Sequence, residues 1–192
     1  MNDESVSIGA DDGSARAESL QLDRKNEEVR VRPATSDDAA VIARIYNEGI
    51  ADGIATFETR PRVTEDISRW LDSRYPIVVV DEPPDGVIAF ASTSEYRPRE
   101  CYAGIAEFSV YVAREHRGRG AGRVAMLGLI EACQRAGFWK LVSRVFVENL
   151  ASRALLRDLG FREVGIYERH ARLHSVWRDV VIVERLLGEG VG

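Results

Sequence analysis

The residues whose types and spacing are best suited to bind a ligand are three alternating glycines between arginines, at 117–122 (RGRGAG). Glycine lets the main chain approach a ligand closely and adopt left-handed angles, so that successive amide hydrogens can converge on one anion. The segment follows an apolar stretch and opens a helical pattern, and a helix N-terminus attracts negative charge. The pattern therefore predicts a phosphate or pyrophosphate site.

Three interpretations of this turn compete. A P-loop requires Gly-Lys-Ser/Thr, whereas this chain has Gly122, Arg123 and Val124, so the magnesium-binding hydroxyl is missing. A dinucleotide fingerprint would open a parallel β-α-β unit and place an acid on the second strand, but the next strand carries Arg144. On this segment alone, a basic turn that binds nothing remains the third possibility.

Hydrophobic periodicity and capping residues outline the elements that must position the turn. Strands are expected over 29–32, 77–80, 87–92, 105–112, 141–147, 161–167 and 177–187. Helices are expected from the cap at 35–38 to about Gly49, from 64 to the Tyr75-Pro76 pair, over 120–136 and over 151–159. A meander followed by alternating strands and helices implies an α/β (α+β) fold, with a mixed central sheet flanked by helices.

Length and charge limit the organisation of the chain. A chain of 192 residues is long enough for one domain and a tail. The first 28 residues carry eight acids and three bases, a balance equal to the net charge of −5 of the whole chain. We expect 1–28 to be a disordered acidic leader and 29–188 to be one domain. Because the remainder is neutral, its charge gives no case for nucleic-acid binding.

Composition also indicates the compartment. The chain has neither a run of roughly 20 apolar residues nor a signal-like start, which predicts a cytoplasmic protein without membrane association. Cys101 and Cys133 are expected to be reduced thiols, and no metal site is predicted. We expect His116 and His170 to be solvated.

Two motifs carry a resemblance to a known family. Arg117, Gly120 and Gly122, after the strand at 108–112, resemble the Arg-x-x-Gly-x-Gly acetyl-CoA motif of the GNAT superfamily of N-acetyltransferases. Segment 149–161 resembles the second GNAT signature, Asn-x-x-Ala/Ser before a helix ending in Gly-Phe. The resemblance covers nearly all of 29–187 and implies the GNAT fold, with acetyl-CoA at the strand-to-helix turn. The implied cofactor contacts are Val110, Val112, Arg117, Gly118, Arg119, Gly120, Ala121, Gly122, Asn149 and Ser152.

Further segments resemble one branch of that superfamily, the phosphinothricin, methionine sulfoximine and arsinothricin N-acetyltransferases. They are 45–50 (IYNEGI), 55–58 (ATFE), 96–99 (YRPR), 107–112 (EFSVYV) and 177–180 (WRDV). Such enzymes acetylate the α-amine of a small amino acid that carries a second anionic or polar head, and so confer antibiotic resistance. The resemblance implies this function, a small amino-acid substrate contacted by Tyr46, Asn47 and Phe57, and a homodimer.

Two arginines and one glutamate suit such a substrate chemically. Guanidinium groups bind carboxylate, phosphinate or arsinate through paired charge-assisted hydrogen bonds, which predicts substrate binding by Arg97 and Arg99. Acetyl transfer needs an uncharged amine, so a base must accept a proton. Glu107 occupies the strand position where this branch has a glutamate beside the amine, and we expect it to be catalytic.

The sequence also departs from the branch pattern. His174 is a second catalytic candidate, because Trp177 and Asp179 align 173–180 with the pattern Lys-His-Gly-x-Trp-x-Asp-Val, but here Leu173 and Ser175 replace lysine and glycine. Many GNAT enzymes have a tyrosine that protonates the coenzyme A thiolate where this chain has Leu156. Water or another group must then supply that proton.

Other functions remain open on the sequence alone. The same chemistry on another small amine or a peptide terminus would need an open, acidic pocket, and the paired arginines argue against a polyamine. A non-catalytic module that binds coenzyme A is the remaining alternative, and the presence of Glu107 beside the glycine-rich turn weighs against it.

Overall fold

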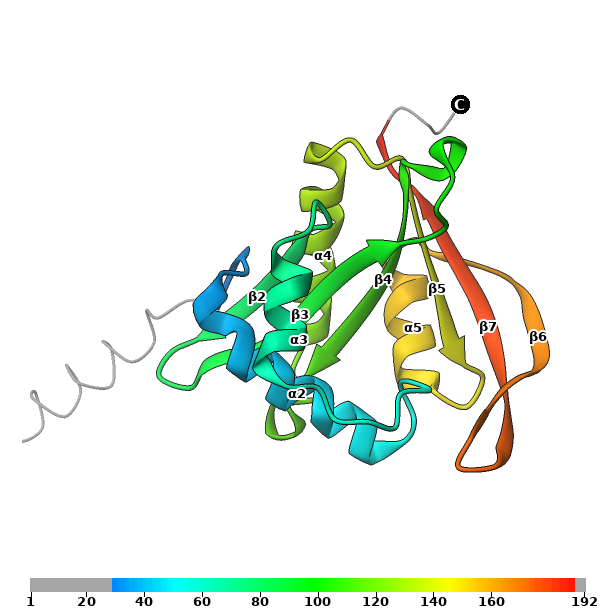
Figure 1. Ribbon diagram of the computed structural model, residues 1–192, viewed down its shortest axis with the longest axis horizontal. Helices are drawn as coiled ribbons and strands as arrows, with labels where there is room; N and C mark the ends of the chain where they lie inside the picture. The colour runs from blue at the N-terminus through cyan, green and yellow to red at the C-terminus, as the bar shows by residue number, and fades with distance from the viewer. Residues whose placement is uncertain (1–28, 189–192) are drawn as a thin grey trace, which may run out of the picture.

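A seven-stranded β-sheet organises the computed structural model, which describes residues 29–188 (Figure 1). In their order across the sheet, the strands are β1 (Arg30–Pro33), β2 (Ile77–Glu82), β3 (Gly86–Glu95), β4 (Ile105–Val112), β5 (Lys140–Phe146), β7 (Val176–Leu186) and β6 (Arg162–Leu173). Neighbouring strands run antiparallel except β4 and β5, which are parallel. The expected mixed sheet with an antiparallel N-terminal meander is thereby confirmed.

Helices cover both faces of this sheet. They are α2 (Ala39–Asp52), α3 (Thr64–Leu71), α4 (Ala121–Arg135) and α5 (Leu150–Asp158). Helices α2 and α3 pack on one face of the N-terminal half of the sheet (Figure 1). Helices α4 and α5 pack on the other face, and α4 makes the crossover that a parallel β4–β5 pair requires.

Alternation along β4 divides its side chains between these two layers. Ala106 and Phe108 belong to the core under α4 and α5, whereas Tyr111 belongs to the core under α2. In a strand, successive side chains point to opposite faces, so Glu107 and Ser109 share the α2 face with Tyr111. Burial of a large side chain such as Phe90 contributes about 1.5–3 kcal/mol. Both faces of the strands that carry the site are therefore held firmly.

The last two strands differ from the expectation. Strand β6 continues to Leu173 and β7 begins at Val176, because the two form one hairpin with register pairs from Arg162–Glu184 to Leu173–Val176. His174 and Ser175 form its two-residue turn with φ angles of 48° and 69°. Positive φ at both central residues matches the right-handed twist of a hairpin. Residues 168–176, which lie between the two expected strands 161–167 and 177–187, are thus mostly strand.

His116 is buried, so the expectation that it is solvated was wrong. It lies in the short turn Arg114–His116 after β4 and is 6% exposed. The turn between β2 and β3 folds against it, and its Nε2 lies 3.0 Å from a carboxylate oxygen of Asp85 and 3.7 Å from one of Glu82. His116 and Asp85 are 31 positions apart, so the local sequence pattern around His116 does not indicate this contact.

The leader predicted at 1–28 lies outside the described residues. Within 29–188, no helix is both long and apolar enough to span a membrane.

Candidate functional site

The parallel strands β4 and β5 pair over only three residues and then separate. Their register pairs are Ile105–Lys140, Ala106–Leu141 and Glu107–Val142, although β4 continues to Val112 and β5 to Phe146. A cavity of about 50 Å³ fills the gap. It is lined by Ala55, Phe108, Ser109, Val110, Tyr111, Ser143, Arg144, Val145, Phe146, Asn149, Ser152 and Leu156. The separation gives a ligand access between two strands of one sheet.

A larger cavity of about 380 Å³ adjoins this gap and extends to the glycine-rich turn. The two cavities share Ala55, Val110, Tyr111, Asn149 and Ser152. The larger one contains eight of the ten predicted cofactor residues, which are Val110, Val112, Arg117, Gly118, Gly120, Gly122, Asn149 and Ser152. Arg119 instead lines a separate hollow beside His116, and Ala121 is buried.

The glycine-rich turn has the geometry of an anion cradle. Gly118 and Gly120 have φ angles of 74° and 94°, and a Cβ added to either would meet nothing within 4 Å. Gly120 caps α4 without a side-chain hydrogen bond, and the amide of Arg123 already donates to the Gly120 carbonyl, so the amides of Ala121 and Gly122 are those that can face an anion. Gly122 has a different role, because a Cβ there would lie 3.4 Å from both Leu155 and Val112. The turn thus fits a pyrophosphate-bearing cofactor.

Arg117 anchors the turn to the end of α2. Its Nη1 lies 2.5 Å from Oδ2 of Asp52, and its Nε donates to the carbonyl of Val112 at 3.1 Å. Asp52 also binds Arg114 at 2.6 Å. Burial raises the pKa of Asp52, but the hydrogen bonds from Arg117 and Arg114 outweigh it and hold that pKa below its usual value. Asp52 was not among the predicted site residues, because its partners lie over 60 positions away.

Asn149 joins α5 to the loop that follows α2. Its Oδ1 accepts a hydrogen bond from the amide of Ser152 at 3.1 Å, which caps α5. Its Nδ2 donates to the carbonyl of Ile54 at 3.1 Å. Both ends of the side-chain amide are therefore used to shape the wall that the two cavities share.

Glu107 forms an ion pair with Arg144 where the two strands begin to separate. Val142 is the register partner of Glu107, and Arg144 follows two residues later, so both charged side chains lie on the α2 face. The side chains of Glu107 and Arg144 are 25% and 44% exposed. Sequence reasoning did not identify Arg144 as a site residue, because its contact depends on the β4–β5 register. An arginine between the apolar residues of this strand was the available signal.

Tyr46, Asn47 and Phe57, which were predicted to contact the substrate, lie in α2 or shortly after it. Each of them contacts other residues of the protein. Asn47 uses both ends of its side-chain amide on the main chain of Arg62, at 2.9 and 2.8 Å. Tyr46 is buried, with its hydroxyl 3.5 Å from that of Thr56. Phe57 packs edge-on against Phe146, which lines the smaller cavity, with ring centroids 4.7 Å apart.

Arg97 and Arg99 lie in the exposed loop after β3, and neither lines the two cavities. The guanidinium of Arg97 lies 5.3 Å from the ring centroid of Tyr96. In the sheet, Ser94 pairs with Glu107, so the loop begins close to that glutamate.

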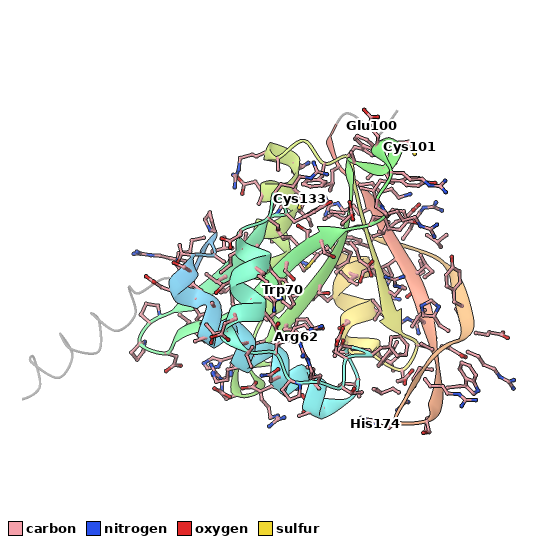
Figure 2. The ribbon with its side chains drawn as sticks, in the orientation of Figure 1. Arg62, Trp70, Glu100, Cys101, Cys133 and His174 are labelled. Atoms are coloured by element: carbon pink, nitrogen blue, oxygen red, sulfur yellow. The ribbon has the colours of Figure 1, made fainter. Side chains whose placement is uncertain are left out.

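His174 lies at the tip of the β6–β7 hairpin and is exposed. Figure 2 shows it at the opposite end of the molecule from Glu100 and Cys101, which directly follow Arg99. Neither Glu107 nor His174 lines the two cavities, but Glu107 pairs with Arg144, which lines the smaller one.

Hydroxyl groups line the gap although Leu156 supplies none. Leu156 is buried in the wall of the smaller cavity, which also contains Ser109, Ser143 and Tyr111. Burial, with a further contribution from Tyr46, raises the pKa of Tyr111 well above its usual value, so its hydroxyl stays protonated.

A separated parallel strand pair with an anion cradle at its open end defines a transferase that binds an acyl-coenzyme A. Residues 42–161 match the model of the acetyltransferase (GNAT) family, and the chain belongs to this family. It is an N-acetyltransferase whose acetyl donor is acetyl-CoA.

Known relatives support this assignment along most of the chain. A phosphinothricin N-acetyltransferase of Streptomyces coelicolor is 31% identical over 166 residues, covering 83% of this chain and 97% of the relative. An L-methionine sulfoximine/L-methionine sulfone acetyltransferase of Pseudomonas aeruginosa is 30% identical over 158 residues, covering 80% and 92%. The crystal structure of a phosphinothricin acetyltransferase from Sinorhizobium meliloti in complex with acetyl-CoA is similar, with a TM-score of 0.79 and 31% identity over 85% of this chain and 90% of that one.

Proposed function

We propose that this cytoplasmic enzyme acetylates the α-amine of a glutamate-like antimetabolite amino acid and so confers resistance to it. The candidate acceptors are phosphinothricin, arsinothricin and methionine sulfoximine. The names of the relatives at about 30% identity support this substrate class. The observation that carries the proposal is the carboxylate of Glu107, which lies at the point where β4 and β5 separate and pairs with Arg144, a residue of the smaller cavity.

Glu107 is the general base in this proposal. An amino group near neutral pH is mostly protonated, and only its uncharged form can accept an acetyl group. When bound, acetyl-CoA supplies the acetyl group as an activated thioester. Glu107 accepts the proton from the substrate ammonium, and a main-chain amide at Val110 or Val112 polarises the thioester carbonyl. We prefer Glu107 to His174, because Glu107 pairs with Arg144, a residue of the smaller cavity, whereas His174 is exposed at a hairpin tip and contacts neither cavity.

The residues of the cradle hold the cofactor in this proposal. The amides of the first turn of α4 bind the pyrophosphate, and Asn149 and Ser152 border the channel for the pantetheine arm. Arg97 and Arg99 bind the second anionic or polar head of the amino acid, from the loop that starts beside the Ser94–Glu107 pair.

A homodimer is part of the proposal. Strand β6 is an edge of the sheet, and Val164, Ile166 and Tyr167 on it are each about half exposed, between 49% and 55%. Exposed apolar side chains along an edge strand favour pairing with a second copy. Light scattering would measure a mass of twice 21.4 kDa if the dimer forms.

One assay tests the function. The protein is incubated with acetyl-CoA and, separately, with phosphinothricin, arsinothricin, methionine sulfoximine, spermidine or a lysine peptide, and release of the free thiol is followed. We expect turnover with at least one of the three amino acids. Turnover with spermidine or the peptide alone would overturn the substrate class in favour of another small amine or a peptide terminus. If acetyl-CoA binds without turnover of any amine, the chain is a non-catalytic binding module.

A further inference from the structure

The ion pair between Glu107 and Arg144 makes a positive charge part of the acceptor site. The carboxylate that we propose as the base does not face an empty pocket, because the guanidinium of Arg144 contacts it directly. Arg144 also lines the small cavity between the separated strands. A ligand that reaches Glu107 through this gap therefore meets both charges.

The surroundings of Arg144 in the sheet do not explain why an arginine occupies this position. Its neighbours two residues away on the same face of β5 are Val142 and Phe146, and its register partner on β7 is Ile182. All three are apolar. At Arg144, β5 pairs with β7 on one side and borders the gap to β4 on the other, and a long cationic side chain there gives up rotamer freedom and adds little to the sheet. Among the described residues, Glu107 is the carboxylate with which Arg144 pairs.

The charges of this pair are complementary to those of a free α-amino acid. Such a substrate carries an ammonium and a carboxylate on the same carbon, so the two charges are close together, like those of Glu107 and Arg144. An arginine binds a carboxylate through two parallel hydrogen bonds, a geometry that a lysine does not reproduce. A zwitterion can therefore replace one internal ion pair by two intermolecular ones.

We propose that Arg144 binds the α-carboxylate of the acceptor and thereby determines that the acceptor is a free amino acid. This inference rests on the proposed function and adds to it a residue that selects the substrate. When the substrate carboxylate engages Arg144, the guanidinium is drawn from Glu107, and Glu107 is left to accept the ammonium proton. An amine without a carboxylate cannot displace Glu107 from Arg144, so the ion pair stays intact. Arg144 thus has two roles. It binds the substrate carboxylate, and until a substrate arrives it compensates the negative charge of Glu107.

The test compares two forms of one acceptor on two forms of the enzyme. The acceptors are the best amino acid of the panel and its α-carboxamide, which retains the amine but lacks the negative charge. The enzymes are the parent and Arg144→Met, with Arg144→Lys as a second variant that keeps the charge. We expect the parent to prefer the amino acid by about 10- to 100-fold in kcat/KM, since hydrogen bonds between charged groups have this magnitude. Arg144→Met should abolish most of this preference, mainly through KM, and Arg144→Lys should restore part of it.

Arg162→Met is the matched control. Arg162 also pairs with a glutamate on the neighbouring strand, Glu184, but lines neither of the two cavities. It should leave the preference between acid and carboxamide unchanged. Circular dichroism on each variant verifies folding, and the preference of the parent enzyme remains a test if Arg144→Met does not fold.

The possible failures are distinguishable. Equal loss of activity on both acceptors in Arg144→Met would mean that Arg144 only positions Glu107, which overturns carboxylate binding while the amino-acid substrate stands. No preference in the parent would overturn the inference in the same way. If the parent acetylates no amino acid but does acetylate another amine, the proposed function itself is wrong and the inference falls with it.

Discussion

The ring of Tyr111 occupies the space that a side chain on Gly49 would need. A Cβ added to Gly49 in α2 would lie 2.7 Å from a ring carbon of Tyr111 in β4, closer than real Cβ atoms approach other groups. The ring cannot easily move, because it also packs against Phe90 and Tyr46, with centroids 5.3 and 4.7 Å away. Gly49 and Tyr111 both line the larger cavity, so their contact sets its width.

Gly49→Ala should therefore be destabilising, although alanine is the better helix former. Helix propensity alone would favour alanine by about 1 kcal/mol. Overpacking against Tyr111 should outweigh this and lower the free energy of unfolding by about 1–3 kcal/mol, and acetyl-CoA affinity should fall as well. Urea unfolding and calorimetric titration with acetyl-CoA measure the two effects. Ala51→Gly, at an exposed position of the same helix, is the control and should leave affinity unchanged. An equally stable Gly49→Ala variant would contradict the close contact.

Asp52→Asn should loosen the glycine-rich turn. The substitution retains the shape of the side chain but removes the charge that holds Arg117 and Arg114. At neutral pH we expect a loss of about 1 kcal/mol in the free energy of unfolding, since these partners are partly exposed, and weaker binding of acetyl-CoA.

The pH dependence of this loss has a definite sign. The pKa of Asp52 is lowered in the folded protein, so its contribution is complete above the unfolded pKa of about 3.9 and disappears as the pH falls through the folded value. The difference between parent and Asp52→Asn in urea unfolding should thus be largest at neutral pH and vanish in strong acid. A difference that grew on acidification would refute this assignment.

Substitutions at Asn149 should separate its two hydrogen bonds. Asn149→Ala removes the helix cap and the bond to Ile54, and should lower the free energy of unfolding by about 1 kcal/mol from the cap alone. Asn149→Asp can still accept from Ser152 but cannot donate to Ile54. It should therefore retain most of the stability of α5 while raising KM for acetyl-CoA. Identical kinetics in the parent and Asn149→Asp would show that the bond to Ile54 does not shape the cavity.

Glu107→Gln should impair the chemical step and leave cofactor binding intact. Loss of a positioned general base reduces kcat by about 10²- to 10⁴-fold. Stopped-flow or steady-state assays measure kcat, and calorimetry measures the dissociation constant of acetyl-CoA. Glu131→Gln, an exposed glutamate of α4, is the control. If Glu107→Gln keeps a near-normal kcat, Glu107 is not the general base, and His174 becomes the first candidate.

Local patterns predicted most of the fold. The alternation of Phe108 and Val110 and the periodic apolar residues of 120–136 were sufficient for the strand and helix on either side of the glycine-rich turn. The cradle itself was predictable because its glycines lie close together in sequence, and the structure places Gly118, Gly120 and Gly122 in the wall of the larger cavity.

Features that depend on tertiary register could not be predicted in this way. The Glu107–Arg144 pair depends on which residues of β4 and β5 face each other, and the anchoring of Arg117 by Asp52 joins segments 65 positions apart. The burial of His116 depends on the fold of the β2–β3 turn over it. Single-strand patterns carry no information on such contacts, because the hydrophobic period of a strand is the same in every register.

The short pairing between β4 and β5 also has a consequence for amide hydrogen exchange. Three register pairs join the two halves of the sheet, and beyond them the edge of β4 that faces β5 has no strand partner. Amides on that edge past Glu107 should exchange with solvent faster than those bonded to β3, and a ligand in the gap should slow them. The gap would then be visible in solution as protection that appears along a few residues of β4 when cofactor is added.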